Sequence, residues 1–444
     1  MRMLRLAVVL VVAAAASTGA AATPSAEQPL VTWAAVWKIS SGNHVFAGLC
    51  ATDPNGNAFR VTDPKPTLPD EPLWSADGRW IALTRGSDVY VTDAQGRYRR
   101  QLTDSSRARG SFYAADWSPD GTELLIQFSG TALSSRLFLV TRDGTPGQTL
   151  VVGQFEGGAG SGSWSPDGRR IIFTMGGAVY VIDTDGTNRR KLVDAASGGV
   201  WSPDGGHFAY LAGPGGTGGL GVARADGTDA HLLISGNIRT PAWSPDGRRL
   251  VYVEQRPDST QLDLRVVQTD GSDDRLLAEA VGSGNLIGFG RWGPAWSPDG
   301  SMILFARGEW PSGRVALINP DGTEERTVAT GGFGALSPVW RPSAPPPSDR
   351  RPCLIRGSSR ADVIRGTDRG DLIVGGAGND TISGADGDDL LIGGSGRDRF
   401  YGGRDDDSFR TRDRARDSVF GGPGTDDAFA DGLDHLRSIE RKRR

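Results

Sequence analysis

The chain has few of the side chains from which catalytic and metal sites are usually built. Its 444 residues include two cysteines and four histidines. Cys50 and Cys353 lie too far apart in the sequence to form a local metal clip, and the histidines form neither an HExxH motif nor a closely spaced pair. There is no GxSxG elbow, and the glycine-rich stretches lack the lysine of a phosphate loop. The sequence therefore contains no recognised catalytic motif.

Long apolar runs are also absent, except at the N-terminus. Arg2 and Arg5 precede an apolar stretch from Leu6 to Ala16, and three alanines follow at positions 20–22. This layout predicts a cleaved secretory signal over residues 1–22. An uncleaved anchor helix is the alternative, but the apolar run is shorter than the ~20 residues that cross a bilayer. We expect a secreted or extracellular protein, with association to the cell surface or envelope left open and no transmembrane anchor after cleavage.

Excess positive charge is missing too. The formal net charge is −4, which gives no electrostatic basis for nucleic-acid binding. Glycine, in contrast, is abundant, at 64 residues, about twice its usual share of ~7%. Apolar residues make up 37% of the chain and occur in many short runs. This composition favours an exported repeat protein.

One pentapeptide, WSPDG, recurs along the first three quarters of the chain. It begins at Trp117, Trp164, Trp201, Trp243 and Trp296, with a variant WSADG at Trp74 and a degenerate WRPS at Trp340. The repeat length of roughly 40 to 45 residues is that of four-stranded propeller blades. Proline and aspartate set the turn, and glycine accepts its left-handed conformation. The tryptophan is well suited to fill the space between blades.

Each pentapeptide is followed by two apolar runs joined by a second turn. That turn is Asp-Gly or Asn-Gly in most copies, as at Asp143-Gly144 and Asp321-Gly322, which predicts a β-hairpin. The whole pattern resembles the TolB-like β-propellers, and the resemblance covers roughly residues 31–345. It implies an all-β domain, residues 23–345, of seven or six four-stranded blades.

The two ends of this domain are incomplete in opposite ways. Residues 31–63 supply a hairpin and one further strand but no WSPDG, whereas Trp340 has no hairpin after it. We therefore predict one blade built from both ends, which makes seven; the ring has six blades if the N-terminal piece packs outside it. Closure would bring Cys50 near Cys353, so we predict a disulfide in an oxidising compartment, with two free thiols as the alternative.

After a proline-rich linker at residues 346–354, a nine-residue period begins. Glycines recur at the first position, aspartates at the sixth and apolar residues at the eighth, for example Gly375, Asp380 and Ile382. These repeats resemble the RTX or hemolysin-type calcium-binding unit GGxGxDxUx. The resemblance implies a short parallel β-roll over residues 355–431. The alternative is a disordered tail rich in glycine and aspartate.

In such a roll the turns would bind calcium through carbonyl and carboxylate oxygens. We expect two to four ions, held between turns two repeats apart, so that Asp371 pairs with Asp389, Asp389 with Asp407 and Asp380 with Asp398. The candidate residues are Asp371, Gly375, Gly378, Asp380, Gly384, Gly387, Asp389, Gly393, Gly396, Asp398 and Asp407. Arg369 and Asp405 replace expected glycines, which limits the number of ions. The remaining residues, 432–444, are expected to be a solvated basic tail or a last strand or short helix.

Two functions agree with these features. The first is a secreted, non-enzymatic calcium-binding protein: a monomer whose propeller face contacts a protein or glycan. The second is a secreted hydrolase or lyase that uses acidic residues at the propeller mouth.

Overall fold

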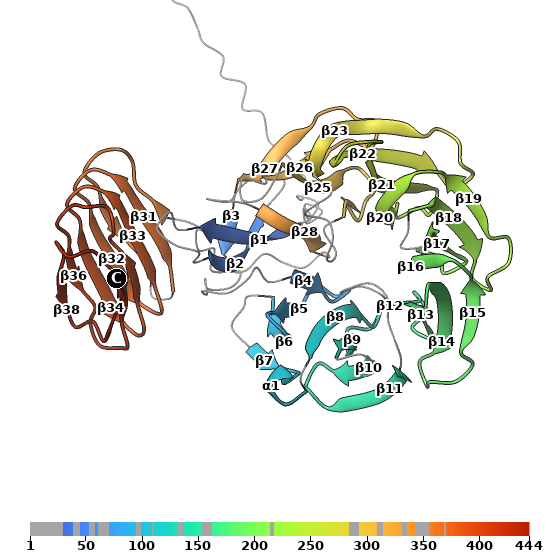
Figure 1. The fold of residues 1–444 in the computed structure, drawn as a ribbon, viewed down its shortest axis with the longest axis horizontal. Coiled ribbons are helices and arrows are strands. Elements are labelled where there is room, and N and C mark those ends of the chain that lie inside the picture. The colour runs from blue at the N-terminus through green and yellow to red at the C-terminus, as the bar shows by residue number, and fades with distance from the viewer. Residues whose placement is uncertain are drawn as a thin grey trace, which may run out of the picture.

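The computed structural model describes residues 30–38, 45–52, 58–60, 71–94, 99–108, 110–130, 136–152, 162–213, 217–283, 293–308, 314–330, 335–341, 355–367 and 370–443. For the strands at the two ends of the propeller it describes the backbone only. Figure 1 shows a ring of sheets beside a smaller roll that contains the C-terminus. No helix in the described ranges has the length and hydropathy to cross a membrane.

Within these residues the ring consists of seven four-stranded antiparallel sheets, six of them each formed by one contiguous segment. A single short helix, α1 (Ser105–Ala108), precedes the second of the six among the described elements. The strands of the six sheets are β4 (Glu71–Trp74), β5 (Trp80–Arg85), β6 (Asp88–Asp93) and β7 (Arg99–Gln101); β8 (Ser111–Trp117), β9 (Glu123–Ser129), β10 (Arg136–Thr141) and β11 (Pro146–Val152); β12 (Gly162–Trp164), β13 (Arg170–Met175), β14 (Ala178–Asp183) and β15 (Arg190–Val193); β16 (Ala196–Trp201), β17 (His207–Ala212), β18 (Gly219–Arg224) and β19 (His231–Ile234); β20 (Asn237–Trp243), β21 (Arg249–Gln255), β22 (Gln261–Gln268) and β23 (Arg275–Ser283); and β24 (Ala295–Trp296), β25 (Ile303–Arg307), β26 (Arg314–Ile318) and β27 (Arg326–Thr330).

The seventh sheet joins the two ends of the propeller. Its order is β28 (Ala335–Arg341), β1 (Leu30–Lys38), β2 (Val45–Thr52) and β3 (Ala58–Arg60). Val31 pairs with Trp340 and Trp33 with Cys50, and β28 also lies against β25 and β4. This confirms the predicted closure by a sheet that combines both ends.

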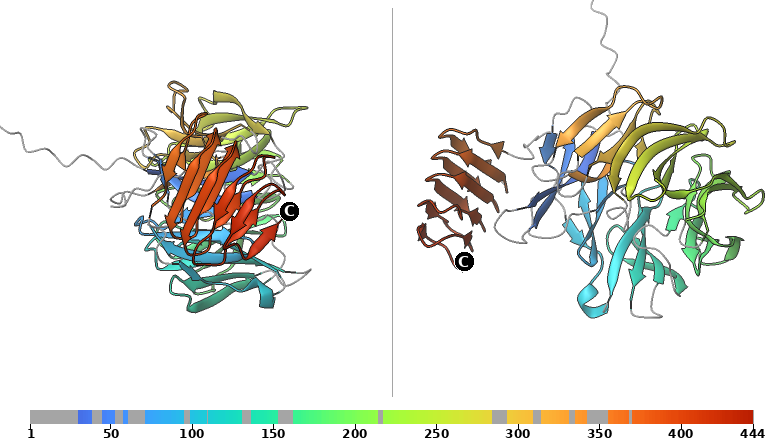
Figure 2. Two further views of the ribbon diagram at one scale, coloured as in Figure 1. Left: turned by 90° about the vertical axis from the view of Figure 1, so that its left-hand side faces the viewer. Right: turned by 45° about the horizontal axis from the view of Figure 1, so that its top comes forward.

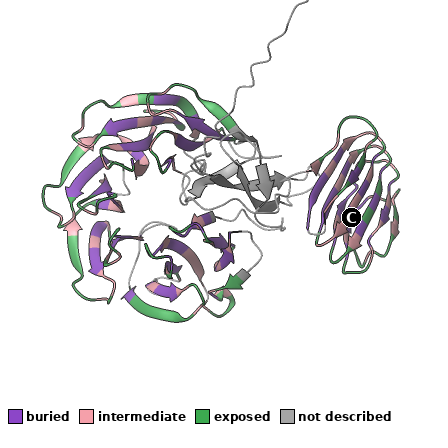
Figure 3. Ribbon diagram, turned by 180° about the vertical axis from the view of Figure 1, so that it is seen from behind, coloured by how far each residue is buried: buried purple, intermediate pink, exposed green. Residues whose placement is uncertain are grey.

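The middle strands of the blades are buried on both faces because each sheet packs between two others. In β21, Leu250 and Tyr252 pack on the preceding blade, while Val251 and Val253 pack on the following one with Trp296. A strand covered on both sides needs apolar residues at consecutive positions rather than at alternate ones. Figure 3 shows the buried strands within the ring and the exposed segments at its rim.

The C-terminal module is a roll of two parallel sheets, as the nine-residue period predicts. One sheet contains β29 (Ile355–Arg356), β31 (Leu372–Ala377), β33 (Leu390–Ser395), β35 (Ser408–Arg410), β37 (Asp427–Phe429) and β39 (Arg441–Arg443). The other contains β30 (Val363–Arg365), β32 (Thr381–Asp386), β34 (Arg399–Arg404), β36 (Ser418–Phe420) and β38 (His435–Arg437). A stripe of eighth-position side chains, including Ile382, Leu391 and Phe400, fills the core between the sheets.

Residues 432–444 do not form a solvated tail. His435–Arg437 pairs with Ser418–Phe420, and Arg441–Arg443 pairs with Asp427–Phe429. The expectation of a last strand is therefore correct, and each of the two sheets ends with one strand from this segment.

Candidate calcium-binding roll

The roll places equivalent residues of alternate repeats directly side by side. Ile373 pairs with Leu391 and Ile382 with Phe400, a separation of two nine-residue units. Successive aspartates therefore fall on opposite edges of the roll. This arrangement brings together the three aspartate pairs that the sequence predicts.

The sixth-position aspartates form two hydrogen-bonded ladders. In each step the backbone N–H of one aspartate donates to a carboxylate oxygen of the aspartate two repeats later. The N···O distances are 2.6 Å for Asp371 to Asp389, 3.0 Å for Asp389 to Asp407 and 2.8 Å for Asp380 to Asp398. These side chains are almost fully buried. One oxygen of each accepting carboxylate therefore has a structural role.

The other carboxylate oxygen of several aspartates has no donor. Oδ2 of Asp380, Asp407 and Asp426 is buried without a hydrogen-bond partner in the described structure. A buried acceptor that lacks both water and a donor is costly. A bound cation would compensate for that cost.

The first glycine of each repeat leaves open the space beside this oxygen. A Cβ at Gly402 would overlap Asp407 Oδ2 and lie 2.6 Å from the carbonyl oxygen of Gly421. A Cβ at Gly384 would overlap Asp389 Oδ2 and lie 2.7 Å from the carbonyl oxygen of Gly402. Carboxylate and carbonyl oxygens thus converge where no side chain fits, which is the ligand chemistry that Ca²⁺ prefers.

The described residues contain no cluster of three or more histidine, cysteine, aspartate or glutamate side chains that could hold a metal. A cation in these turns would therefore depend on backbone carbonyls as well as aspartates. The fourth-position glycines support such turns, since Gly378, Gly387 and Gly396 have φ of 115°, 98° and 132°. Asp405 keeps the left-handed conformation at this position, with φ of 76°. The backbone of the repeat therefore persists where its sequence departs from the consensus.

Burial changes the acidity of the aspartates in the later turns. Desolvation raises the pKa of Asp398 to about 6, that of Asp417 to about 7 and that of Asp407 to about 8, and neighbouring carboxylates add to each shift. In the metal-free roll Asp407 therefore holds a proton at neutral pH and Asp417 is about half protonated, whereas Asp398 takes up a proton only at lower pH. Calcium would have to displace those protons.

We predict that the apparent calcium affinity rises between pH 6 and pH 8, the range of these pKa values. Because the folded pKa lies above the unfolded value of 3.8, metal-free folding is favoured at low pH and that advantage disappears as the pH rises through the folded pKa. Calcium binding, in contrast, requires the ionised form. Calorimetric titrations in buffers of different ionisation enthalpy would measure the released protons. An affinity that does not change over this range would contradict the prediction.

Four aspartates of the ladders are missing from the candidate residues of the sequence prediction: Asp362, Asp417, Asp426 and Asp434. Asp398 N–H donates to Asp417 at 2.8 Å, and Asp407 N–H donates to Asp426 at 2.9 Å. The nine-residue register slips by one residue after Phe409, so that Phe400 pairs with Val419. A search that allowed one inserted residue would have found Asp417 and Asp426.

In the propeller the acidic turns have a structural function. The serine of each pentapeptide, not assigned a role from the sequence, is buried. Ser165 Oγ donates to Asp167 Oδ1 at 2.5 Å and accepts the N–H of Arg170 at 2.9 Å. The same bond to serine is the main cause of a lowered pKa for Asp167. These carboxylates are charged turn caps rather than candidates for proton transfer.

We predict that Ser165→Ala destabilises the propeller by about 1 to 3 kcal/mol, because the N–H of Arg170 loses the buried Ser165 hydroxyl as its partner. Urea unfolding followed by tryptophan fluorescence would measure the shift. Ser106→Ala is a control, since Ser106 is exposed and its loss should change stability by less than about 0.5 kcal/mol. Equal effects of the two changes would refute the assigned role.

The tryptophans connect neighbouring blades, as their size suggests. The indole Nε1–H of Trp117 donates to the Leu73 carbonyl of the preceding blade at 2.9 Å, and that of Trp243 donates to Val200 at 3.0 Å. The guanidinium of Arg249 lies 4.6 Å from the centre of the Trp296 ring in the next blade. The pentapeptide therefore determines blade stacking as well as a turn.

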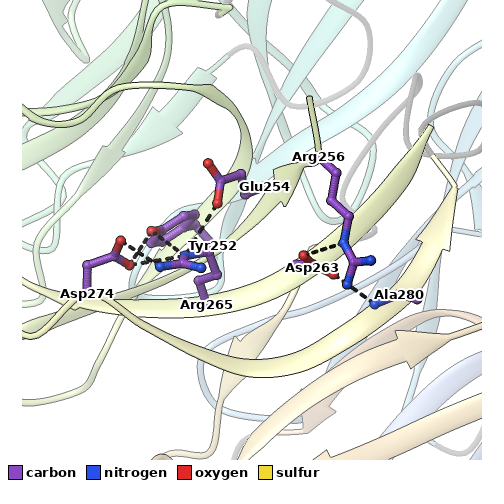
Figure 4. A network of polar contacts seen from close by, with 7 residues as sticks. All are labelled: Tyr252, Glu254, Arg256, Asp263, Arg265, Asp274 and Ala280. Carbon is purple, nitrogen blue, oxygen red and sulfur yellow. Dashed lines mark hydrogen bonds and ion pairs between the residues drawn. The ribbon is translucent and has the colours of Figure 1, made fainter. Parts of the chain in front are cut away.

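Other charged groups of the propeller are also paired. Figure 4 shows Arg265 between Tyr252, Asp274 and Glu254 on one sheet, with the Arg265–Asp274 ion pair at 2.8 Å. Burial and the bond to Asp274 raise the pKa of Tyr252. Burial, together with the charge of Asp120, raises the pKa of Glu123. Glu123 lines a hollow of about 260 Å³ between two pentapeptide turns.

Cys353 lies outside the described residues, and only the backbone of Cys50 is described. The predicted disulfide therefore remains a prediction, as does the signal at residues 1–22, which also lies outside the described ranges.

Two known proteins are similar in sequence to parts of this chain. An uncharacterised protein of Agrobacterium fabrum is 26% identical over 303 residues, which cover 64% of this chain and 85% of that protein. The uncharacterised peptidase YuxL of Bacillus subtilis is 40% identical over 65 residues, so the chain spans only 8% of its length.

Solved structures are similar in fold at low sequence identity. A puromycin-hydrolysing peptidase of Mycobacterium tuberculosis aligns with a TM-score of 0.51 and 14% identity, over 78% of this chain and 62% of that one. TolB from Acinetobacter baumannii aligns with a TM-score of 0.44 and 16% identity, over 71% of this chain and 83% of that one.

Family profiles match both modules. Residues 117–344 match the TolB β-propeller domain, and residues 356–391 and 383–411 match the RTX calcium-binding nonapeptide repeat. The chain therefore belongs to the TolB β-propeller family and carries RTX calcium-binding repeats after its propeller.

Proposed function

We propose that the protein is an exported, non-enzymatic binding or scaffold protein whose C-terminal roll folds around two to four calcium ions. The observation that carries this proposal is the pair of aspartate ladders. Buried carboxylate oxygens without donors, such as Asp407 Oδ2, lie beside positions where only glycine fits. Asp371, Asp380, Asp389, Asp398 and Asp407 would supply carboxylates, and the turn glycines would supply carbonyl oxygens. An extracellular calcium concentration would then determine when the module is folded.

The propeller would contact a protein or a glycan through one of its two faces. The pentapeptide turns and the Asp-Gly turns lie together on one face, where Thr184 N–H donates to the Arg169 carbonyl at 3.0 Å. The strands that flank the connections between blades end on the opposite face, and the connections vary in length, from two residues between β15 and β16 to residues 284–294 between β23 and β24. Variable connections on a rigid scaffold are where binding residues are commonly found. We therefore assign partner contact to this second face.

A direct test is capture of envelope components by the full chain, with calcium and with chelator, followed by light scattering of the eluted complex. A defined partner that is retained in calcium and released by shortening the connection at residues 284–292 would support the proposal. Retention of nothing above the background of a propeller from another family would count against it. Light scattering of the free chain would test the expected monomer.

A hydrolase or lyase at the propeller mouth is the second candidate. Glu123 is the one described side chain in its favour, because burial raises its pKa beside an accessible hollow. Its neighbours Asp120 and Asp167 cap turns and keep lowered pKa values. A Glu123→Gln variant that abolished cleavage of a glycan or ester substrate would favour this candidate.

We further predict a disulfide between Cys50 and Cys353, because they are the only two cysteines and β2 lies in the sheet that β28 completes. The bond would close a loop of about 300 residues and add roughly 5 kcal/mol at most by the chain-entropy estimate. Thiol titration of the denatured, unreduced protein should find no free thiol. Two titratable thiols would reject the bridge.

A further inference from the structure

The two sheets of the roll present outward faces of different character. Residues just before and after each core position point away from the core. On β31 and β33 of one sheet these are apolar, and Leu372 and Leu390 are 0% and 2% exposed. In the sheet of β30, β32, β34, β36 and β38 the equivalent residues are polar or aromatic except for Val363, and six of the ten are exposed. This second face is the more open of the two to a partner.

The open face lies on the far side of the roll. Figure 1 places β32, β34, β36 and β38 away from the propeller and β31 and β33 on the near side, and the left view of Figure 2 looks onto the far side. One row of outward residues runs across its five strands: Arg365, Ser383, Tyr401, Phe420 and Arg437. At the ~4.8 Å spacing of strands the row is roughly 19 Å long.

Aromatic rings occupy the centre of this row. Tyr401 and Phe420 stack with ring centroids 5.2 Å apart and an angle of 7° between the planes. Tyr401 is nevertheless 43% exposed, and its neighbour in the row on the other side is the small Ser383. The guanidinium of Arg437 lies 5.6 Å from the Phe420 ring. The stack therefore has one end covered by Arg437 and the other end bordered by a small residue.

The charged side chains in the two outward rows of this face have one sign. Arg365, Arg399 and Arg437 are exposed, and none of them forms an ion pair with a described residue. Neither of the two outward rows contains an aspartate or a glutamate. These three guanidinium groups, which have no ion-pair partner among the described residues, lie around an aromatic pair and form a cationic surface on a chain of net charge −4.

We propose that this face binds a linear acidic polysaccharide, with uronate carboxylates on Arg365, Arg399 and Arg437 and a sugar ring against Tyr401 above Ser383. Guanidinium groups pair with carboxylates in a bidentate geometry, and an aromatic ring offers a flat apolar surface to the C–H face of a sugar. A straight row of roughly 19 Å suits an extended polymer. A membrane fits less well, because the flat sheet offers no amphipathic helix to insert between lipids.

Isothermal titration of the full chain with a short oligomannuronate in calcium tests the proposal. We expect binding that weakens with salt, and no binding of the neutral mannan oligomer. The double variant Arg365→Gln/Arg437→Gln should lose roughly tenfold in affinity, the cost of two charge-assisted contacts at a surface. Tyr401→Ala should weaken binding without changing its salt dependence.

The matched control is Arg189→Gln/Arg314→Gln, which removes the same charge from two exposed arginines of the propeller and should leave affinity unchanged. Resistance to trypsin in calcium shows whether each variant still folds its roll, and so separates loss of this site from failure of calcium-dependent folding. Equal weakening by the control, or no weakening by a folded roll variant, would overturn the proposal. Binding of anionic vesicles or DNA, but not of the uronate, through the same arginines would overturn it as well.

Discussion

Chelation of calcium is expected to unfold residues 355–443 while the propeller remains folded. Without the ion, buried aspartates must either take up protons or lie close together with like charge, because desolvation and neighbouring carboxylates raise the pKa of Asp407. Glycine-rich turns also cost more backbone entropy to order than other sequences. The core stripe ending in Val419 and Ala428 is too thin to offset both. Binding free energy then becomes folding free energy.

The distribution of aromatic residues allows the two modules to be followed separately. All 12 tryptophans lie at or before residue 340, so their fluorescence reports the propeller, while arginines throughout the roll provide trypsin sites. Chelator should make the roll rapidly cleavable and leave the tryptophan spectrum unchanged. Protection should return at roughly 0.1 to 1 mM calcium, the range of extracellular modules. Identical cleavage in chelator and in calcium would refute the calcium requirement.

Variants within one turn test which side chains bind calcium. Asp389→Asn should raise the calcium midpoint about tenfold if this carboxylate is a ligand, and Gly384→Ala should do at least as much because its Cβ would overlap Asp389 Oδ2. Asp388→Asn is the matched control, since Asp388 is exposed beside the ladder. A midpoint that Asp388→Asn raised as much as Asp389→Asn would contradict the assignment of ligands.

The roll could be predicted from the sequence because its repeat is short and its constraints are local. Once the resemblance to the RTX unit implies a roll of two sheets, the nine-residue period places Asp371, Asp389 and Asp407 on one edge. The hydrogen bonds between these aspartates do not follow from the period, because they depend on how the backbone of one turn approaches the side chain of another. Asp417 was missed for a simpler reason, since one extra residue breaks the period before it.

The propeller was predictable because the sequence constraints of its turns are also local. Trp, Pro, Asp and Gly each have a preference that survives in an isolated turn. Serine does not, and the buried Ser165 acquires its function only in the folded turn, where its hydroxyl binds Asp167 and the N–H of Arg170. The difference between the outward faces of the two sheets was also not predicted. Each sheet is built from every second repeat, so the difference is visible only when the outward residues of alternate repeats are compared.

Deletion of residues 23–60 is expected to turn the propeller into an aggregating product. It removes β1, β2 and β3, the partners of β28, so that β28 keeps no sheet and the blades of β4–β7 and β24–β27 each lose a neighbour. Exposed edges and uncovered apolar faces favour association between chains. Size-exclusion chromatography with light scattering would show large species in place of a monomer.

Deletion of residues 355–444 is the control for this experiment, because it removes more chain but leaves β28 paired with β1 through Val31 and Trp340. That truncated protein should stay monomeric and unfold cooperatively in urea, with the tryptophan signal of the intact chain. The comparison separates ring closure from simple loss of mass, since only the first deletion opens the ring. If the protein lacking residues 23–60 were soluble and unfolded cooperatively at the same urea concentration, the N-terminal strands would be an addition to the ring rather than its closure.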